Sequence, residues 1–465
     1  MRILFASALA MLISLSLNAD GIRDTAHAKK TLEIYRKVIS IPTVAGRGEV
    51  RALADYLAAE LGKAGFAQED IHILPNNETV ALVVRYRGDG SSGKKPVLLL
   101  GHLDVVEALA KDWERPPFEL TQDDKYFYGR GTVDNKLGVT MLTSTFIRLK
   151  KEGFVPTRDL IIAFSGDEET DMLSTRMLAH ESKDLTGDAA FALNSDAVGG
   201  SLTAEGRAIS YSVQAAEKTY VDFELTVRNP GGHSSRPRSD NAIYELAAAL
   251  MNIQRYQFPV MHNDLTRNFF RISGEQLGGE LGQAMSRFAA NPEDKTASDR
   301  LAIESSYVGS TRTTCVTTML QAGHAQNALP QSATANVNCR IFPGVRVAEV
   351  KQALQDVVAN AAVEFVTLGD PVESPISELR DDVMAAVGLA VHARYPDVTI
   401  MAHMSSGGTD GMHFRSAGIP TWAMSSIFMN PDDNFAHGLN ERLPIATFYD
   451  GLDHWTIILK ELAGR

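Results

Sequence analysis

Cysteine is scarce in this sequence, since only Cys315 and Cys339 occur among its 465 residues. Two cysteines are too few for a disulfide-dense mini-protein or a four-cysteine zinc site, so histidine and carboxylate side chains would have to hold any metal. An excess of positive charge is also absent, because 45 Lys and Arg oppose 57 Asp and Glu, giving a formal net charge of −12. Proteins that bind nucleic acid through its phosphates normally carry the opposite sign, so we expect no nucleic-acid partner.

Long hydrophobic runs are missing after the first 19 residues. Those residues, MRILFASALAMLISLSLNA, place Arg2 before an apolar run and end in the small residue Ala19. This order is typical of a secretory signal peptide, and the run is short for the roughly 20 residues that a membrane span needs. We therefore expect residues 1–19 to be a signal peptide and the mature chain to be periplasmic or secreted, with no membrane contact.

The composition that remains is that of a globular protein, with 44% hydrophobic and 22% charged residues, enough to bury a large core. From about residue 30, segments with helical spacing alternate with short apolar runs such as 97–100 and 160–164. This alternation predicts an α/β fold in which helices flank a mostly parallel sheet. We assign residues 20–206 and 374–465 to this domain.

A different pattern fills residues 207–373. The expected elements are two strands or one bent strand at 209–227, a helix at 242–253, strands at 313–321 and 333–342, and a helix at 347–359. This order predicts a separate small α+β domain inserted into the first. Within it, residues 257–310 are polar, and we expect them to be helical and exposed.

Acidic and histidine side chains follow the expected strands of the first domain. His102 and Asp104 lie in "LLLGHLDVV", where one intervening residue lets both side chains point the same way. A neutral imidazole binds divalent metals and a nearby carboxylate can orient it, although a lone His-x-Asp is also an ordinary strand-end pair. Asp134 lies in the glycine-rich loop "GRGTVDNKLG", where the alternative role is a helix N-cap.

Further candidates complete this set. Asp167, Glu168 and Glu169 follow the strand "LIIAFS", and three adjacent acids repel one another unless a cation is near; the alternative is a solvated acidic loop. Asp196 ends another strand in "FALNSDAVGG", and His437 occurs downstream in "NFAHGLNERL". Because the carboxyl ends of parallel strands share one sheet edge, these clusters are expected to meet there. Together they suit two metal ions with a shared carboxylate and one free carboxylate as a base.

These motifs resemble those of a known family. "GHLDVV", "GRGTVDNK", "SGDEE", "GGHSS", "SSGGTDG" and "AHGLNE" occur in the same order as in the M20 zinc metallopeptidases, and they cover almost the whole mature chain. That family includes glutamate carboxypeptidases, dipeptidases, aminoacylases and deacetylases. Each motif is weak alone, but the set is specific.

The resemblance implies a role for each candidate. His102 and Asp196 would bind one Zn²⁺, Glu169 and His437 would bind the other, and Asp134 would bridge both. Co²⁺ or Mn²⁺ could substitute for Zn²⁺. Glu168 would be the general base, with Glu169 as the competing candidate, since the sequence leaves open which carboxylate faces the metals. Asp104 would orient His102.

The inserted domain resembles the family's lid, which often also forms a dimer. His233 in "GGHSS" would stabilise the oxyanion of the tetrahedral intermediate, although a turn histidine is the simpler reading. Asn327 and Arg340 would contact substrate, and an arginine at a strand end could equally be structural. Gly408 and Thr409 of the "GGTDG" loop would approach the substrate closely. We expect a homodimer, with a monomer as the alternative.

The cysteines allow one inference that is independent of the family. Cys315 and Cys339 lie twelve residues on either side of Asn327, between two expected strands. If those strands form an antiparallel hairpin centred there, the two thiols face each other. A cross-strand disulfide is then a hypothesis, which an oxidising compartment permits.

The leading functional interpretation is an exported di-zinc hydrolase that cleaves the amide next to a free amino acid. Its first version is an exopeptidase, a carboxypeptidase or dipeptidase, acting on short peptides. Its second version is an aminoacylase acting on N-acyl amino acids. An alternative of another class is a non-catalytic periplasmic binding protein on the same scaffold, which predicts the loss of a ligand or of the base.

Overall fold

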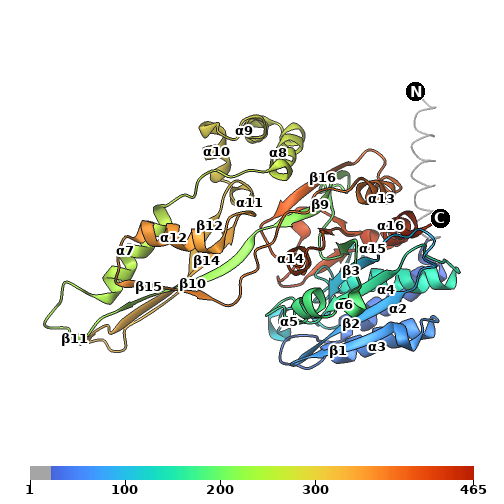
Figure 1. Ribbon diagram of the computed structural model, residues 1–465, viewed down its shortest axis with the longest axis horizontal. Helices are drawn as coiled ribbons and strands as arrows, with labels where there is room; N and C mark the ends of the chain where they lie inside the picture. The colour runs from blue at the N-terminus through green and yellow to red at the C-terminus, as the bar shows by residue number, and fades with distance from the viewer. Residues whose placement is uncertain (1–21) are drawn as a thin grey trace. The chain divides into compact units, whose positions relative to one another are not determined.

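The computed structural model describes residues 22–465 and divides them into two units (Figure 1). The first unit comprises residues 22–214, Ser377–Met401 and Thr409–Arg465, and the second comprises Ala215–Ile376 and Ala402–Gly408. The signal peptide expected at 1–19 lies outside the described residues. Within residues 22–465, no helix is both long and apolar enough to cross a membrane.

A ten-stranded sheet organises the first unit. Its strands, in spatial order, are β1 (Ile71–Asn76), β2 (Thr79–Tyr86), β6 (Leu160–Ser165), β3 (Val97–His102), β7 (Phe191–Asn194), β17 (Thr421–Ala423), β9 (Ala208–Glu217), β8 (Gly200–Leu202) and β18 (Phe428–Met429), with β16 (Thr399–Ser405) paired to β9. The central strands β6, β3, β7 and β17 run parallel. Antiparallel pairs flank them, since β2 pairs antiparallel with β1 and β6, and β9 does so with β17 and β8.

Helices cover both faces of this sheet, which explains why β3 and β6 are apolar and buried along their whole length. The helices of the first unit are α2 (Ala26–Ser40), α3 (Val50–Lys63), α4 (Lys136–Lys151), α5 (Leu173–Arg176), α6 (Lys183–Thr186), α13 (Asp381–His392), α14 (Gly411–Ser416), α15 (Ile445–Asp450) and α16 (His454–Ala463). Helices α3 and α4 contact β2 and β3, whereas Phe414 of α14 packs with Leu98 and Leu100 on the opposite face. The α/β class with an inserted α+β unit is therefore confirmed.

Short elements connect these layers. They are the single turns η1 (Gln68–Asp70), η2 (Ala110–Asp112), η3 (Met177–Glu181) and η4 (Pro431–Asp433), and a small sheet of β4 (Thr121–Gln122), β5 (Tyr126–Tyr128) and β19 (Arg442–Pro444). The small sheet matters for the site described below, because the pairing of β19 with β5 fixes the chain directly after residues 430–441, as the pairing of β18 with β8 fixes it directly before them.

A four-stranded antiparallel sheet forms the second unit. Its order is β12 (Thr314–Ala322), β14 (Ser332–Ile341), β10 (Thr219–Arg228) and β15 (Val363–Leu368). Helices α7 (Ala242–Arg255) and α12 (Val347–Val358) pack on one face, where Phe223, Leu246 and Leu354 belong to one buried core. Alternation of buried and partly exposed residues along β14 matches a sheet with one covered face. A two-stranded ladder joins β11 (Gly232–His233) to β13 (Ala328–Leu329).

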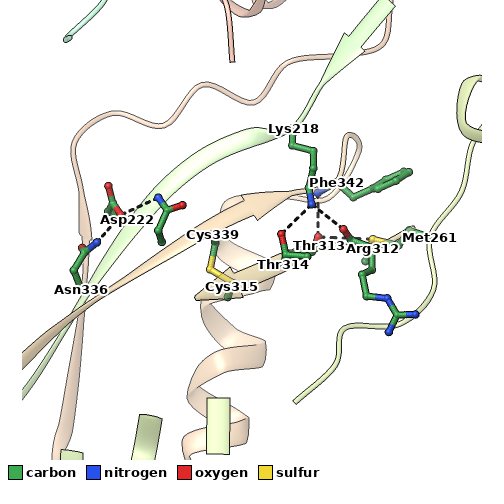
Figure 2. Close-up of a disulfide and its surroundings, with 11 residues drawn as sticks. Lys218, Asp222, Met261, Arg312, Thr313, Thr314, Cys315, Asn336, Cys339 and Phe342 are labelled. Carbon is green, nitrogen blue, oxygen red and sulfur yellow. Dashed lines mark hydrogen bonds between the residues drawn. A yellow bond between two sulfur atoms is a disulfide. The ribbon is translucent and has the colours of Figure 1, made fainter. Parts of the chain in front are cut away.

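The hairpin of β12 and β14 carries a disulfide between Cys315 and Cys339 (Figure 2). The two residues are register partners, as are Thr314 with Arg340 and Thr317 with Val337, so the hairpin is centred on Asn327 until a bulge after Thr317. The cross-strand disulfide predicted from the equal spacing is confirmed.

The stretch 257–310 folds into four helices with a hydrophobic core of their own. The helices are α8 (Asp264–Leu277), α9 (Gly279–Ala290), α10 (Lys295–Ala302) and α11 (Ser305–Val308). Phe270, Met285 and Phe288 are buried in this cluster. The expectation of helices was right, but the segment is a packed subdomain and not merely an exposed one.

Several boundaries differ from those predicted. The region 209–227 consists of two strands, β9 and β10, separated at Lys218. The second unit begins at Ala215 instead of residue 207, because β9 continues the first sheet. Residues 402–408 return to the second unit, which the sequence placed in the first. The strand expected at 421–427 ends at Ala423, and the chain then continues as a loop to β18.

Candidate metal centre

Six acidic and histidine side chains converge at the carboxyl-end edge of the main sheet. His102 is the last residue of β3, Glu168 and Glu169 follow β6, and Asp196 follows β7. Asp134 lies in the loop before α4, and His437 lies in the loop before β19. All six belong to the first unit. The parallel centre of the sheet explains the convergence, since β3, β6 and β7 end side by side.

His102 is fully buried, and both nitrogens of its ring have an oxygen partner. Its Nδ1 lies 3.1 Å from the backbone oxygen of Asp104, and because a carbonyl oxygen only accepts, Nδ1 carries the proton. The other ring nitrogen, Nε2, lies 2.9 Å from Oδ1 of Asp134. A bound cation would take the place of the proton between Nε2 and Asp134, while the hydrogen bond from Nδ1 keeps the ring oriented, as in metal-binding histidines.

Asp134 lies between the two histidines. Its Oδ1 faces Nε2 of His102, whereas its Oδ2 lies 3.2 Å from Nε2 of His437. Nε2 of His437 is also 2.9 Å from Oε2 of Glu169. A carboxylate that offers one oxygen to each side is the arrangement needed for a ligand shared by two ions.

Potential ligand atoms cluster in groups small enough to hold single ions. One group contains His102, Asp134 and Asp196, and a second contains Asp134, Glu169 and His437. Asp134 is common to both groups. A third group contains His102, Glu168 and Glu169. Glu169 pairs with His437 and occurs in two of these groups, whereas Glu168 occurs in one, so the assignment of Glu169 as ligand and Glu168 as base stays a prediction.

Electrostatics at this edge favour a bound cation. Burial, together with the neighbouring Asp134, raises the pKa of Asp196 well above its ordinary value. Hydrogen bonds with Asp134 and Glu169 raise the pKa of His437 to about 10. Acidic side chains outnumber the two histidines, so a positive charge placed among them would relieve the repulsion. Mixed histidine and carboxylate donors of this kind fit Zn²⁺ and related divalent metals.

The carboxylate of Asp104 binds the turn that carries Glu168 and Glu169, a contact that the sequence did not indicate. Its Oδ1 accepts the backbone N–H of Glu168 at 3.1 Å, and its Oδ2 accepts that of Glu169 at 3.0 Å. The carboxylate also lies 3.5 Å from Nδ1 of His102. The same side chain therefore holds the turn that presents both glutamates and lies beside the first histidine.

Other buried residues beside the site have partners that the sequence did not indicate. Glu441 and Arg130 form a buried ion pair beside the loops of Asp134 and His437. Asp410 is buried and accepts hydrogen bonds from Ser165 and Thr175. The motifs "GRGTVDNK", "AHGLNE" and "GGTDG" contained Arg130, Glu441 and Asp410, but no local spacing indicated their partners.

The remaining predicted residues are divided between the units. Thr409 begins a segment of the first unit, whereas Gly408, His233, Asn327 and Arg340 belong to the second. His233 pairs with Ala328 across the β11–β13 ladder, and the N–H of Ser234 donates to the oxygen of Asn327, so the two predicted residues are neighbours.

Arg340 lies on β14 and stacks over the ring of Tyr220, with 4.6 Å from its guanidinium carbon to the ring centroid. Burial lowers its pKa. The stacking shows a local structural contact for Arg340. Its substrate role, like those of His233 and Asn327, stays a prediction.

Comparison with known proteins identifies the family. Residues 98–461 match the model of peptidase family M20/M25/M40. This chain belongs to that family. It is 30% identical to the N-fatty-acyl-amino acid synthase/hydrolase PM20D1 of Bos taurus over 372 residues, which are 76% of this chain and 71% of the relative.

Solved structures of the M20 family share the fold. A metallo-carboxypeptidase, Sso-CP2 of Sulfolobus solfataricus, matches with a TM-score of 0.70 at 17% identity, over 92% of this chain and 98% of the other. The dipeptidase Dug1p of Saccharomyces cerevisiae matches with a TM-score of 0.66 at 18% identity, over 97% and 98% of the two chains. The chain is thus an M20 metallohydrolase, and its described residues supply ligand groups for a dinuclear metal site.

Proposed function

We propose that this M20 enzyme hydrolyses the amide bond that joins an acyl group to a free amino acid. The observation that carries the proposal is the position of Asp134, whose two carboxylate oxygens face His102 and His437 beside the buried Glu168. Such a site fits two metal ions and a nearby base. These are the groups that the hydrolysis of an unactivated amide requires.

The ligands of the two ions follow from the two groups that share Asp134. His102 and Asp196 would hold one Zn²⁺, Glu169 and His437 would hold the other, and Asp134 would contact both. When bound, the ions would polarise the scissile carbonyl and acidify water. We propose Zn²⁺ because each group of three side chains offers histidine nitrogen and carboxylate oxygen atoms as ligands. Co²⁺ or Mn²⁺ would serve as substitutes.

Glu168 is proposed as the general base. Burial, with added repulsion from Asp196 and Asp410, raises the pKa of its carboxyl well above the ordinary value, which favours holding a proton. Its carboxylate would take a proton from water and return it to the nitrogen of the departing amine. The backbone N–H bond to Asp104 fixes the position from which it acts.

N-acyl amino acids are the proposed substrate class. The support is the similarity to the N-fatty-acyl-amino acid synthase/hydrolase of Bos taurus, which has the same family fold and 30% identity. The sequence alone put short peptides first, and the fold shared with Sso-CP2 and Dug1p keeps peptides as the second candidate. Both substrates present the same bond next to a free carboxylate.

The deciding experiment measures amino-acid release by residues 20–465 loaded with Zn²⁺. The panel pairs each N-acyl amino acid with its carboxamide and adds dipeptides, with and without chelator. We expect chelator-sensitive release from the free acids, faster for N-acyl amino acids than for dipeptides. Equal release from acids and carboxamides would contradict recognition of a free amino acid, and release from dipeptides alone would favour the exopeptidase.

Substitution of the base tests the mechanism. Glu168→Gln should lower kcat by about 10²–10⁴-fold with metal content unchanged, because the amide keeps the shape of the side chain but takes no proton. Asp171→Asn, an exposed acid of the same turn, is the matched control and should keep wild-type kcat. Metal-loaded protein that binds substrates without hydrolysing them would instead support the non-catalytic binding protein.

Export and assembly are further proposals. The N-terminal pattern supports a periplasmic or secreted protein cleaved near Ala19, and the lid-like second unit supports a homodimer. Sequencing of the mature N-terminus and light scattering of the purified chain test the two proposals separately. An uncleaved N-terminus or a monomeric mass would overturn the corresponding one.

A further inference from the structure

Arg130 and Glu441 form an ion pair that is almost completely withdrawn from solvent. Nη1 of Arg130 lies 2.7 Å from Oε2 of Glu441, and the side chains are 3% and 0% exposed. The two residues are 311 positions apart in the chain. One belongs to the loop that leads to Asp134, and the other follows the loop of His437, so the pair joins the two segments that carry these ligands.

The carboxylate of Glu441 holds the Asp134 loop by accepting hydrogen bonds from backbone N–H groups of that loop. Its Oε2 accepts the N–H of Gly131 at 3.0 Å, while its Oε1 accepts those of Val133 at 2.7 Å and Asp134 at 3.2 Å. Both carboxylate oxygens are therefore used, and one of the three donors is the backbone of Asp134 itself. Because charge-assisted hydrogen bonds are stronger than neutral ones, this contact restricts the loop tightly.

Arg130 holds the His437 loop in the same way. Its Nη2 donates to the backbone oxygens of Gly438 at 3.1 Å and His437 at 3.4 Å. His437 has a φ of 62°, a left-handed conformation that is unfavourable for a non-glycine residue and persists only where the surroundings impose it. The guanidinium also lies over the ring of Trp113, which limits its movement.

We propose that the Arg130–Glu441 pair positions Asp134 and His437 relative to each other, and so controls the affinity of the metal site that Glu169, His437 and Asp134 form. The inference rests on the metal ligands of the proposed function. The effect should be larger at this site than at the other, because the His437 loop that Arg130 binds serves this site alone, whereas Asp134 is common to both sites and His102 ends strand β3 and is held by Asp104.

A contribution to folding stability does not by itself explain why the chain buries the Arg130–Glu441 ion pair. Replacing a buried ion pair by uncharged groups is often neutral for folding, since the desolvation of two charges offsets their attraction. Removing one partner leaves a buried charge and destabilises strongly. A double replacement therefore separates the two roles, because it restores stability without restoring the contacts that orient the ligand loops.

The test uses Arg130→Met combined with Glu441→Gln. The glutamine keeps one oxygen for the N–H groups of Val133 and Asp134, and the methionine fills the space beside Trp113 without bonding the His437 loop. Glu60→Gln is the matched control, because Glu60 is a buried carboxylate of α3 paired with Lys30 and Lys63, outside the metal centre. Arg130→Lys is a conservative variant. It keeps the positive charge but loses the guanidinium group, whose separate nitrogens bond Glu441 and the His437 loop.

Zn²⁺ affinity is measured by competition with a chromogenic chelator in two backgrounds that each remove one site. In Asp196→Asn, which leaves the Glu169–His437 site, the double replacement should weaken Zn²⁺ about 10–100-fold, as loss of outer contacts to metal ligands does. In His437→Ala, which leaves the other site, the loss should be clearly smaller, because only the contact with the shared Asp134 is altered there. Arg130→Lys should give an intermediate loss in the first background.

Equal weakening in both backgrounds, or none in a folded double variant, would overturn the proposal. So would an equal effect of Glu60→Gln, since that would mean that any buried carboxylate matters. Metal-free unfolding midpoints of all variants show whether folding is preserved. The outcome is independent of the proposed activity, because wild-type protein that binds two Zn²⁺ but releases no amino acid would refute the reaction and leave the positioning result intact.

Discussion

The carboxylate of Asp104 accepts the backbone N–H of Glu168 at 3.1 Å and so joins the ends of two neighbouring strands, β3 and β6. The resemblance to M20 enzymes assigned Asp104 to His102, and the backbone oxygen of Asp104 does accept the Nδ1 proton of that ring. The carboxylate adds a second connection, because its other oxygen accepts the N–H of Glu169. Asp104 thus contacts His102, a candidate ligand, and the turn that carries Glu169, the other candidate ligand, and Glu168, the proposed base.

Asp104→Asn should impair the site while leaving the fold intact. An amide has one acceptor oxygen, so its NH₂ group would face the N–H of Glu168 or Glu169 and displace that turn. We expect kcat/KM to fall about 10–100-fold, with Zn²⁺ affinity reduced as well, since both glutamates depend on the turn. Steady-state kinetics and metal content check this, with Asp171→Asn as the control. Wild-type kinetics in Asp104→Asn would contradict the role of the turn.

The main sheet and the meeting of the candidate ligands at its edge could be predicted because the signals are local. Residues 97–100 of β3 and 160–164 of β6 are uninterrupted apolar runs, as in buried parallel strands, and polar residues begin at the last position of each strand. Placing His102 and Glu169 at one sheet edge then needed only the rule that parallel strands end together. The disulfide was likewise predictable, because the equal distances of Cys315 and Cys339 from Asn327 defined a register.

Contacts between distant segments could not be predicted in this way. Arg130 and Glu441 are 311 positions apart, and nothing in the spacing around either residue indicates the other. The division between Glu168 and Glu169 was open for the same reason, since it depends on His437, which lies 268 positions from Glu169. The unit boundary at Ala215 was also missed, because β9 extends the first sheet into residues that resembled the inserted domain.

We expect the buried amine of Lys218 to make the stability of the protein depend on pH. Its amine is buried and donates to the backbone oxygen of Arg312 at 2.9 Å and the hydroxyl of Thr314 at 3.1 Å, as Figure 2 shows. Burial, with repulsion from Arg340, lowers its pKa from 10.5 to about 7. Between these values the unfolded chain binds more protons than the folded one, so this residue makes stability rise with pH over that range.

Lys218→Met removes that contribution. The difference in Tm between the variant and the wild type should therefore be most favourable to the variant at pH 6 and should decrease steadily towards pH 9. Thermal unfolding at three pH values measures it. Lys295→Met, at an exposed lysine of the same unit, should show a constant difference. A constant difference for Lys218→Met would mean that its amine keeps an ordinary pKa.

The Cys315–Cys339 disulfide should stabilise the second unit. It closes a loop of 24 positions in the unfolded chain, and the chain-entropy relation gives about 3.5 kcal/mol for a loop of this size. The variant Cys315→Ala/Cys339→Ala should lose roughly that much in denaturant unfolding while keeping wild-type Zn²⁺ content, because the ligands lie in the first unit. Two free thiols in denatured, unreduced wild-type protein would show that the bond does not form.

We expect the four-helix subdomain at 257–310 to unfold independently of the rest of the chain when Phe270 is replaced. Its ring is fully buried, lies 5.2 Å from the centroid of Phe288, and packs within a cluster separate from the core of the four-stranded sheet. Phe270→Ala should destabilise the subdomain by about 3–5 kcal/mol, because it removes one of the two buried phenylalanine rings of a small core and leaves a cavity. We expect rapid proteolysis confined to residues 257–310 with Zn²⁺ affinity unchanged, whereas Leu277→Ala, at a residue that is 55% exposed, should cleave as the wild type does. If Phe270→Ala instead lowered Zn²⁺ affinity or unfolded the whole chain in one step, the helices would be an integral part of the enzyme's folding unit and not an independent addition to it.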